Sequence, residues 1–158
     1  MTEILGELVQ DIFRLCRNKC KKIAVCESIT GGLVVSALIG EDGASKCVEE
    51  GFITYSNDAK QNRLKVESQT LSKFGAVSAE TAAQMCEGIW RDGFVTVSTT
   101  GNAGPTAMDG KPVGRVYVGV CCGTTSVYEF NFEGDRNQIR TQAATAALEI
   151  LKTVLERV

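Results

Sequence analysis

The feature that most constrains the fold is the regular alternation of helical and strand patterns along the chain. Helical spacing of apolar residues runs through 2–19, 33–39 and 78–90, whereas short apolar runs with β-branched residues occupy 22–26, 47–55 and 94–100. Helices that alternate with buried strands are typical of α/β proteins, in which helices cover both faces of the sheet. We therefore expect a three-layer α/β/α sandwich, formed as a single domain over residues 1–158.

The last third of the chain modifies this pattern. Residues 113–121 and 126–132 read as two strands joined by Gly123, Thr124 and Thr125, which predicts an antiparallel hairpin. Asp135 and Gln138 have the spacing of a capping box and would open a final helix that runs to the C-terminus. The sheet is thus expected to be mixed rather than purely parallel.

Charge and hydropathy exclude several classes of partner. The formal net charge is −2, with 17 basic and 19 acidic side chains, which gives no basic field for direct nucleic-acid binding. No apolar run approaches the roughly 20 residues that span a bilayer, so no membrane association is expected. Glu3, Glu7 and Asp11 stand where a signal peptide would be basic and then apolar, and we expect a cytoplasmic protein with reduced thiols on its seven cysteines.

The chain contains no histidine, which narrows the chemistry available to it. Histidine is the commonest general base and the commonest metal ligand, so Ser-His and Cys-His mechanisms are excluded. Neither a metal nor an organic cofactor is expected. Among the remaining residue types, a serine activated by a lysine is the nucleophile and base pair that this composition favours.

Two strands end in loops of small residues, at 27–32 and 99–105. Ligands of open α/β sheets bind beyond the carboxyl ends of the strands, so both loops are expected at one ligand-binding edge. Ser28 in the first loop is a candidate nucleophile, although a serine before a helix also serves as a simple N-cap. A helix that starts after this loop would favour an anion or an oxyanion.

Lys60 is the candidate base. If Asn57 caps a short helix over 58–64, Lys60 lies in its first turn, where the helix dipole opposes a cation. Burial at such a position lowers the pKa of an amine and leaves it free to accept a proton. A solvated surface lysine is the alternative that the residues alone leave open.

Six motifs, in order, resemble those of the CinA C-terminal family, the competence/damage-inducible proteins. They are Glu27-Ser28-Ile29-Thr30-Gly31-Gly32, Gly51-Phe52-Ile53-Thr54-Tyr55-Ser56-Asn57-Asp58-Ala59-Lys60, Gly75-Ala76-Val77-Ser78, Thr100-Gly101-Asn102-Ala103-Gly104-Pro105, Lys111-Pro112-Val113-Gly114 and Gly134-Asp135-Arg136. Members are nicotinamide-nucleotide amidohydrolases, which convert nicotinamide mononucleotide (NMN) to nicotinate mononucleotide and ammonia. The resemblance implies this reaction, a Ser28-Lys60 dyad, and a homodimer or larger assembly.

Further roles are expected around the dyad. The backbone amides of Thr30, Gly31 and Gly32 are candidate oxyanion donors at the helix start. Tyr55 and Asn57 flank the lysine and would orient it or the substrate. Thr100 and Gly101 would line the pocket, and Arg136 and Arg140 would bind the substrate phosphate. Each of these residues also has a purely structural interpretation. Tyr55 could only pack at the strand end, Asn57 could only cap the helix, and the two arginines could be solvated surface residues.

The sequence departs from the family pattern at two places. Ile29 replaces the usual cysteine after the motif serine, which leaves Ser28 as the only nucleophile of that motif. The second loop has Asn102 and then Thr106-Ala107-Met108-Asp109-Gly110, where the family has isoleucine and several glycines. Larger members carry an N-terminal nucleotide-processing domain that 158 residues cannot contain.

The competing functions are a non-catalytic module that binds a phosphorylated ligand, and an amidase for another small amide.

Overall fold

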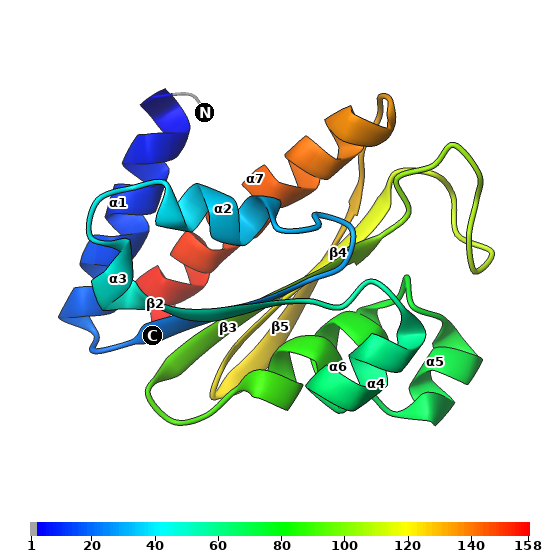
Figure 1. Cartoon of the computed structure of the whole chain (residues 1–158), viewed down its shortest axis with the longest axis horizontal. Helices are drawn as coiled ribbons and strands as arrows, with labels where there is room; N and C mark the ends of the chain where they lie inside the picture. The colour runs from blue at the N-terminus through cyan, green and yellow to red at the C-terminus, as the bar shows by residue number, and fades with distance from the viewer. Residues whose placement is uncertain (1–2) are drawn as a thin grey trace.

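The computed structural model describes residues 3–158 and has a five-stranded sheet with helices on both faces (Figure 1). The strands lie in the order β2-β1-β3-β4-β5. The elements, in chain order, are α1 Glu3–Asn18, β1 Lys22–Glu27, α2 Leu33–Ile39, α3 Ala44–Cys47, β2 Val48–Ile53, α4 Asn57–Leu64, α5 Ser68–Phe74, α6 Ala79–Ile89, β3 Phe94–Gly101, β4 Arg115–Cys122, β5 Thr124–Asn131 and α7 Arg136–Arg157. This is the mixed three-layer sandwich that the sequence predicts.

Strand directions place the two small-residue loops at one edge. β1 pairs in parallel with both β2 and β3, so the carboxyl ends of these three strands lie together. β4 and β5 complete the sheet as an antiparallel hairpin on the other side of β3. The loops after β1, β2 and β3 therefore meet at the edge where ligands bind in open α/β sheets.

Each face of the sheet has its own core. Ile23 and Val25 of β1 pack with the helix layer formed by α1, α2 and α7, whereas Ala24 and Cys26 pack with α4, α5 and α6. Successive side chains of a strand point to opposite faces, and a central strand covered on both sides is apolar throughout. Burial on both faces fixes the position of Glu27 and Ser28 at the end of β1.

Local details differ from the sequence expectations in three places. The short helices α3 and α5 carry too few apolar repeats to be predicted from periodicity. The hairpin turn is tighter than expected, with Gly123 alone between β4 and β5. Ser56, rather than Asn57, caps α4, because its Oγ accepts the Ala59 amide at 3.0 Å. Lys60 still lies within the first turn and a half of that helix.

None of the helices between residues 3 and 158 combines the length and the apolar character that crossing a membrane requires.

Candidate active site

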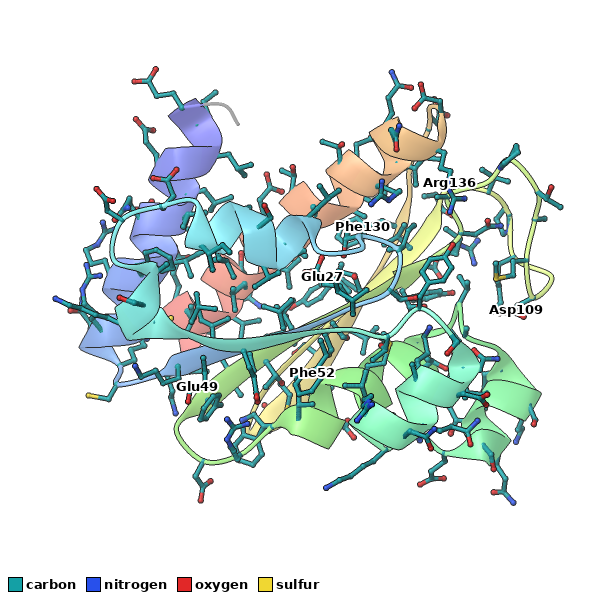
Figure 2. The ribbon with its side chains drawn as sticks, in the orientation of Figure 1. Glu27, Glu49, Phe52, Asp109, Phe130 and Arg136 are labelled. Carbon is teal, nitrogen blue, oxygen red and sulfur yellow. The ribbon has the colours of Figure 1, made fainter. Side chains whose placement is uncertain are left out.

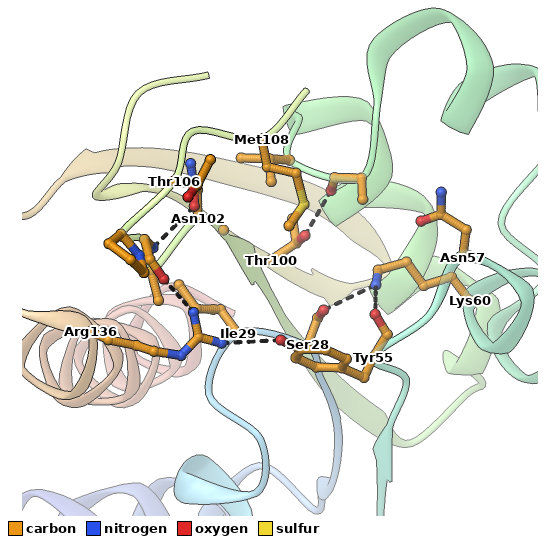
Figure 3. Close-up of a pocket in the computed structure, with 16 residues that line it drawn as sticks. Ser28, Ile29, Tyr55, Asn57, Lys60, Thr100, Asn102, Thr106, Met108 and Arg136 are labelled. Carbon is orange, nitrogen blue, oxygen red and sulfur yellow. Dashed lines mark hydrogen bonds between the residues drawn. The ribbon is translucent and has the colours of Figure 1, made fainter. Parts of the chain in front are cut away.

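The side chains of Ser28 and Lys60 meet at the carboxyl end of the parallel strands (Figure 3). Lys60 Nζ lies 3.0 Å from Ser28 Oγ, which is hydrogen-bonding distance. Ser28 is 8% exposed and Lys60 is 1% exposed, so the pair is largely shielded from water. The structure thus brings together the two residues that the sequence identified as nucleophile and base.

Two backbone carbonyls determine how the Lys60 amine is oriented. Nζ donates to Thr54 O at 2.9 Å and to Tyr55 O at 3.3 Å, both just after β2. A neutral amine has two N–H groups and one lone pair. When the N–H groups are bonded to these carbonyls, the lone pair is left to face Ser28 Oγ.

The protonation of Lys60 is shifted toward the free base. Burial lowers the pKa of Lys60 to about 8, and the nearby Asp109 carboxylate partly opposes that effect. Burial disfavours the ammonium because it removes water from the charge, whereas a carboxylate stabilises it. A substantial fraction of Lys60 is therefore neutral at slightly alkaline pH, as a general base requires.

Glu27 occupies the start of α2, where the sequence analysis expected an oxyanion site (Figure 2). Its buried carboxylate accepts the backbone N–H groups of Gly32, Val34 and Val35 at 3.2, 2.9 and 3.0 Å. The Thr30 hydroxyl also donates to it. The Gly31 amide is bonded to Ser28 O at 3.2 Å. The amides of Gly31 and Gly32 are thus engaged within the protein, because a carboxylate of the chain itself already neutralises the helix N-terminus.

The backbone N–H of Ile29 is a different candidate for the oxyanion donor. The C=O and N–H of a trans peptide point in opposite directions. Because Ser28 O accepts the Gly31 amide, the Ile29 N–H points away from the turn, and no group of residues 3–158 accepts it. Ile29 lines the pocket beside Ser28. A donor one residue after the nucleophile is a recurring arrangement in serine hydrolases.

Arg140 supports the nucleophile loop instead of facing the pocket. Its Nε donates to Ile29 O at 3.0 Å and its Nη2 to Thr30 O at 3.2 Å, while Nη1 bonds Asn137 Oδ1 at 3.2 Å. The expected role in binding phosphate does not match this geometry, since three guanidinium nitrogens already have acceptors in the chain. The arrangement fixes the carbonyls on both sides of Thr30.

Arg136 lies at the rim of the pocket and joins three segments. It begins α7, donates through Nη2 to the Tyr55 hydroxyl at 3.1 Å and through Nη1 to Gly104 O. Tyr55 is 67% exposed, so its ring is open to a ligand. Arg136 is the one predicted phosphate ligand whose guanidinium borders the pocket.

The end of β3 and the loop that follows it form the opposite wall. The Thr100 hydroxyl donates to Ala76 O at 2.7 Å, and a Cβ on Gly101 would lie 2.9 Å from Ile29 Cδ1 and from Arg115 O. Gly101 therefore allows the two loops to approach closely. The pocket measures about 280 Å³ and is bounded by Ser28, Ile29, Tyr55, Asn57, Lys60, Ala76, Val77, Thr100, Gly101, Asn102, Ala103, Gly104, Pro105, Thr106, Met108 and Arg136.

Sequence reasoning gave no role to several residues that shape the site. Thr99 Oγ1 lies 2.7 Å from Thr30 Oγ1 and 3.4 Å from the Ser28 amide. Asn102 is buried, accepts the Gly104 amide at 3.1 Å and donates to Lys111 O at 3.3 Å. The available signals were Glu27 at the end of an apolar strand and Asn102 directly after another, because buried polar groups need partners.

Comparisons with known proteins agree with this architecture. A model of the CinA C-terminal domain family matches residues 6–155. A CinA-like protein of Kosmotoga olearia is 45% identical over 152 residues, which cover 94% of this chain and 37% of that protein. The chain spans about two-fifths of the length of the curated relatives it matches.

Solved structures give the same assignment. The competence/damage inducible protein CihA of Agrobacterium tumefaciens superposes with a TM-score of 0.91 at 35% identity, covering 99% of this chain and 98% of that one. A competence-damaged protein (CinA) superfamily protein of Escherichia coli gives 0.88 at 28% identity, covering 98% and 92%. With the ordered motifs, the shared fold and the family match in agreement, the chain belongs to the CinA C-terminal domain family.

Proposed function

We propose that the protein is an amidohydrolase that converts NMN to nicotinate mononucleotide and ammonia. The observation that carries the proposal is the 3.0 Å contact between Lys60 Nζ and Ser28 Oγ, in a protein of the CinA C-terminal family. The pKa of about 8 for Lys60 supports it, since a lysine of ordinary pKa would be a poor base near neutrality.

Acylation would begin with proton transfer from Ser28 to Lys60. Ser28 Oγ bonds to the carboxamide carbon while its proton passes to the lone pair of Lys60 Nζ. The negative charge that develops on the carboxamide oxygen would be stabilised by the Ile29 N–H. When the C–N bond breaks, Lys60 returns the proton to the departing nitrogen, which leaves as ammonia, and an ester on Ser28 remains.

Deacylation uses the same groups in reverse order. Water attacks the ester carbon while Lys60 accepts one of its protons. The second tetrahedral intermediate expels Ser28 Oγ, which recovers its proton from Lys60, and the carboxylic acid product is released and gives up its proton to the solvent. The net reaction consumes one water and needs no metal or redox partner.

Substrate binding is assigned to the pocket rim. The Tyr55 ring offers an exposed aromatic surface beside Ser28, suited to a planar heteroaromatic amide. Arg136 lies at the pocket mouth and would pair with the phosphate. The Asn57 side chain borders the pocket near Lys60 and would contact the carboxamide group.

Product analysis with graded substrates tests the proposal. The protein is incubated separately with NMN, nicotinamide riboside and nicotinamide, and ammonia and the matching acid are quantified. We expect hydrolysis of NMN with the highest kcat/KM, and a large loss when the phosphate is absent. Binding of NMN without ammonia release would support a non-catalytic binding module, and hydrolysis of other small amides alone would identify a different amidase. Either result would reject the proposed function.

A further inference from the structure

The loop over residues 102–114, which joins β3 to β4, is fastened to the connection between α5 and α6. Asp109 lies in this loop with a φ of +55°, close to an isolated bridge between Met108 and Lys111. Its Oδ2 accepts the backbone N–H of Ala76 at 2.9 Å and that of Val77 at 3.4 Å. Figure 2 shows Asp109 in the part of the loop that approaches the side of the sheet covered by α4, α5 and α6. These bonds are the contact that we call the Asp109 latch.

The latch depends on a glycine. A Cβ on Gly75 would lie 2.8 Å from both Cβ and Cγ of Asp109, a separation that real Cβ atoms essentially never show. Asp109 can therefore approach the amides only because residue 75 has no side chain. Ala76, Val77 and Met108 all line the pocket, so the latch forms part of its wall.

The Asp109 carboxylate also acts on Lys60. Among residues 3–158, no arginine or lysine forms a salt bridge with Asp109. Charged or titratable side chains on the elements around Lys60 include Asp58 and Arg63 on α4, Glu80, Cys86 and Glu87 on α6, Cys26 and Glu27 on β1, Tyr55 after β2, Arg136 on α7 and Asp109 in the loop. Of these groups, the Asp109 carboxylate raises the pKa of Lys60.

We propose that Asp109 is a positioning residue that holds the 102–114 loop against the connection between α5 and α6 and thereby closes that wall of the pocket. The inference rests on the proposed function and deepens it. The Asp109 carboxylate raises the pKa of Lys60, so a loop held in this position would also favour the ammonium that Lys60 becomes when it takes the Ser28 proton.

Variants can separate the effect of the Asp109 charge from the effect of the hydrogen bonds that Asp109 accepts. Asp109→Asn keeps an oxygen to accept the Ala76 and Val77 amides but removes the charge. Gly75→Ala keeps the charge but displaces the carboxylate, and Asp109→Ala removes both without adding a side chain at residue 75. Asp58→Asn is the matched control, because it removes an exposed carboxylate from the helix of Lys60 itself.

Three measurements follow each variant, after circular dichroism has confirmed folding: the pH dependence of kcat/KM for NMN, the NMR titration of the Lys60 side chain, and hydrogen exchange at the Ala76 and Val77 amides. In Asp109→Asn we expect both the acid limb of the pH profile and the Lys60 titration to move to lower pH, with exchange little changed. In Asp109→Ala we expect the same shift, faster exchange, and a KM raised about tenfold, the scale of a lost hydrogen bond to a charged group. Gly75→Ala should resemble Asp109→Ala, and Asp58→Asn should resemble the wild type.

The inference and the proposed function can fail separately. If Asp109→Asn titrates and turns over like the wild type, or if Asp58→Asn shifts the profile equally, the effect of the Asp109 charge on Lys60 is wrong while amide hydrolysis stands. If the wild type releases no ammonia from NMN, the proposed function fails, and hydrogen exchange at the Ala76 and Val77 amides still decides whether Asp109 holds the loop. Unchanged amide exchange in Asp109→Ala would reject the latch.

Discussion

The carboxylate of Glu27 accepts the backbone N–H of Val34 at 2.9 Å, across the loop that carries Ser28. Glu27 is the last residue of β1 and Val34 lies in the first turn of α2. The side chain of Glu27 is buried and bonded to four donors. The bond ties the strand end to the helix start and thereby fixes the backbone of the nucleophile between them.

Removal of the Glu27 carboxylate should therefore destabilise the fold and slow turnover. In Glu27→Ala, backbone N–H groups at the start of α2 lose their acceptor in a buried setting, and each such loss costs about 1–3 kcal/mol. We expect a lower free energy of unfolding in urea, and a loss in kcat that exceeds any change in KM. Glu7→Ala, which removes an exposed glutamate, is the control. Wild-type stability in Glu27→Ala would show that the loop holds its shape without this carboxylate.

Substitutions of Arg136 and Arg140, both on α7, should change different steady-state parameters. Arg140→Ala frees the carbonyls of Ile29 and Thr30, and the loss of preorganised geometry near the nucleophile should lower kcat by about tenfold or more. Arg136→Ala removes the guanidinium at the pocket mouth and should mainly raise KM for NMN. Activity on nicotinamide riboside, which has no phosphate, serves as the internal control for Arg136. The reverse pattern, with Arg140 controlling KM, would show that Arg140 is the phosphate ligand.

The depressed pKa of Lys60 predicts how stability changes with pH. The folded protein releases the Lys60 proton at a pH of about 8, whereas an unfolded lysine releases it near its ordinary value of 10.5. Between these values the unfolded state binds more protons, so stability rises with pH. Below pH 8 both states are protonated and this contribution is absent.

Denaturant unfolding of the wild type and of Lys60→Met at several pH values measures this effect. The wild type should gain stability relative to Lys60→Met as the pH rises from about 8 to 10.5. Contributions of other groups that titrate alike in both proteins cancel in the difference. A difference that does not change across this range would mean that Lys60 titrates normally in the folded protein.

The hydroxyl of Thr54 contributes little to the site, unlike its carbonyl. Thr54 is buried, and its Oγ1 has no hydrogen-bond partner among residues 3–158, while its carbonyl accepts from Lys60 Nζ at 2.9 Å. Thr54→Val keeps the shape and the carbonyl and removes the unpaired hydroxyl. We expect retained turnover and a free energy of unfolding that is unchanged or higher by about 1 kcal/mol. A clear loss of stability would indicate a bound water on that hydroxyl.

The sequence was sufficient for the layers and the mixed sheet, because both depend on local periodicity and on short connections. The Ser28-Lys60 pair was predicted from the resemblance to the CinA C-terminal motifs, since the residues alone left a helix cap and a surface lysine as alternatives. The cap of α4 was misplaced by one residue, since Ser56 and Asn57 are both good caps and the choice depends on backbone angles. The roles of Arg140 and Glu27 depend on contacts between residues distant in sequence, or on side-chain direction. An arginine that supports a loop has the same sequence signature as one that binds a phosphate.

The central claim is that Lys60 activates Ser28 as a nucleophile, and ammonia release by single variants at both positions tests it most directly. Ser28→Ala and Lys60→Ala are compared with Ser72→Ala and Lys73→Ala, which remove an exposed serine and an exposed lysine. The account predicts that each dyad variant folds and loses turnover of NMN by about a thousandfold or more, while the two controls stay near the wild-type rate. Near wild-type ammonia release by either folded dyad variant would contradict it.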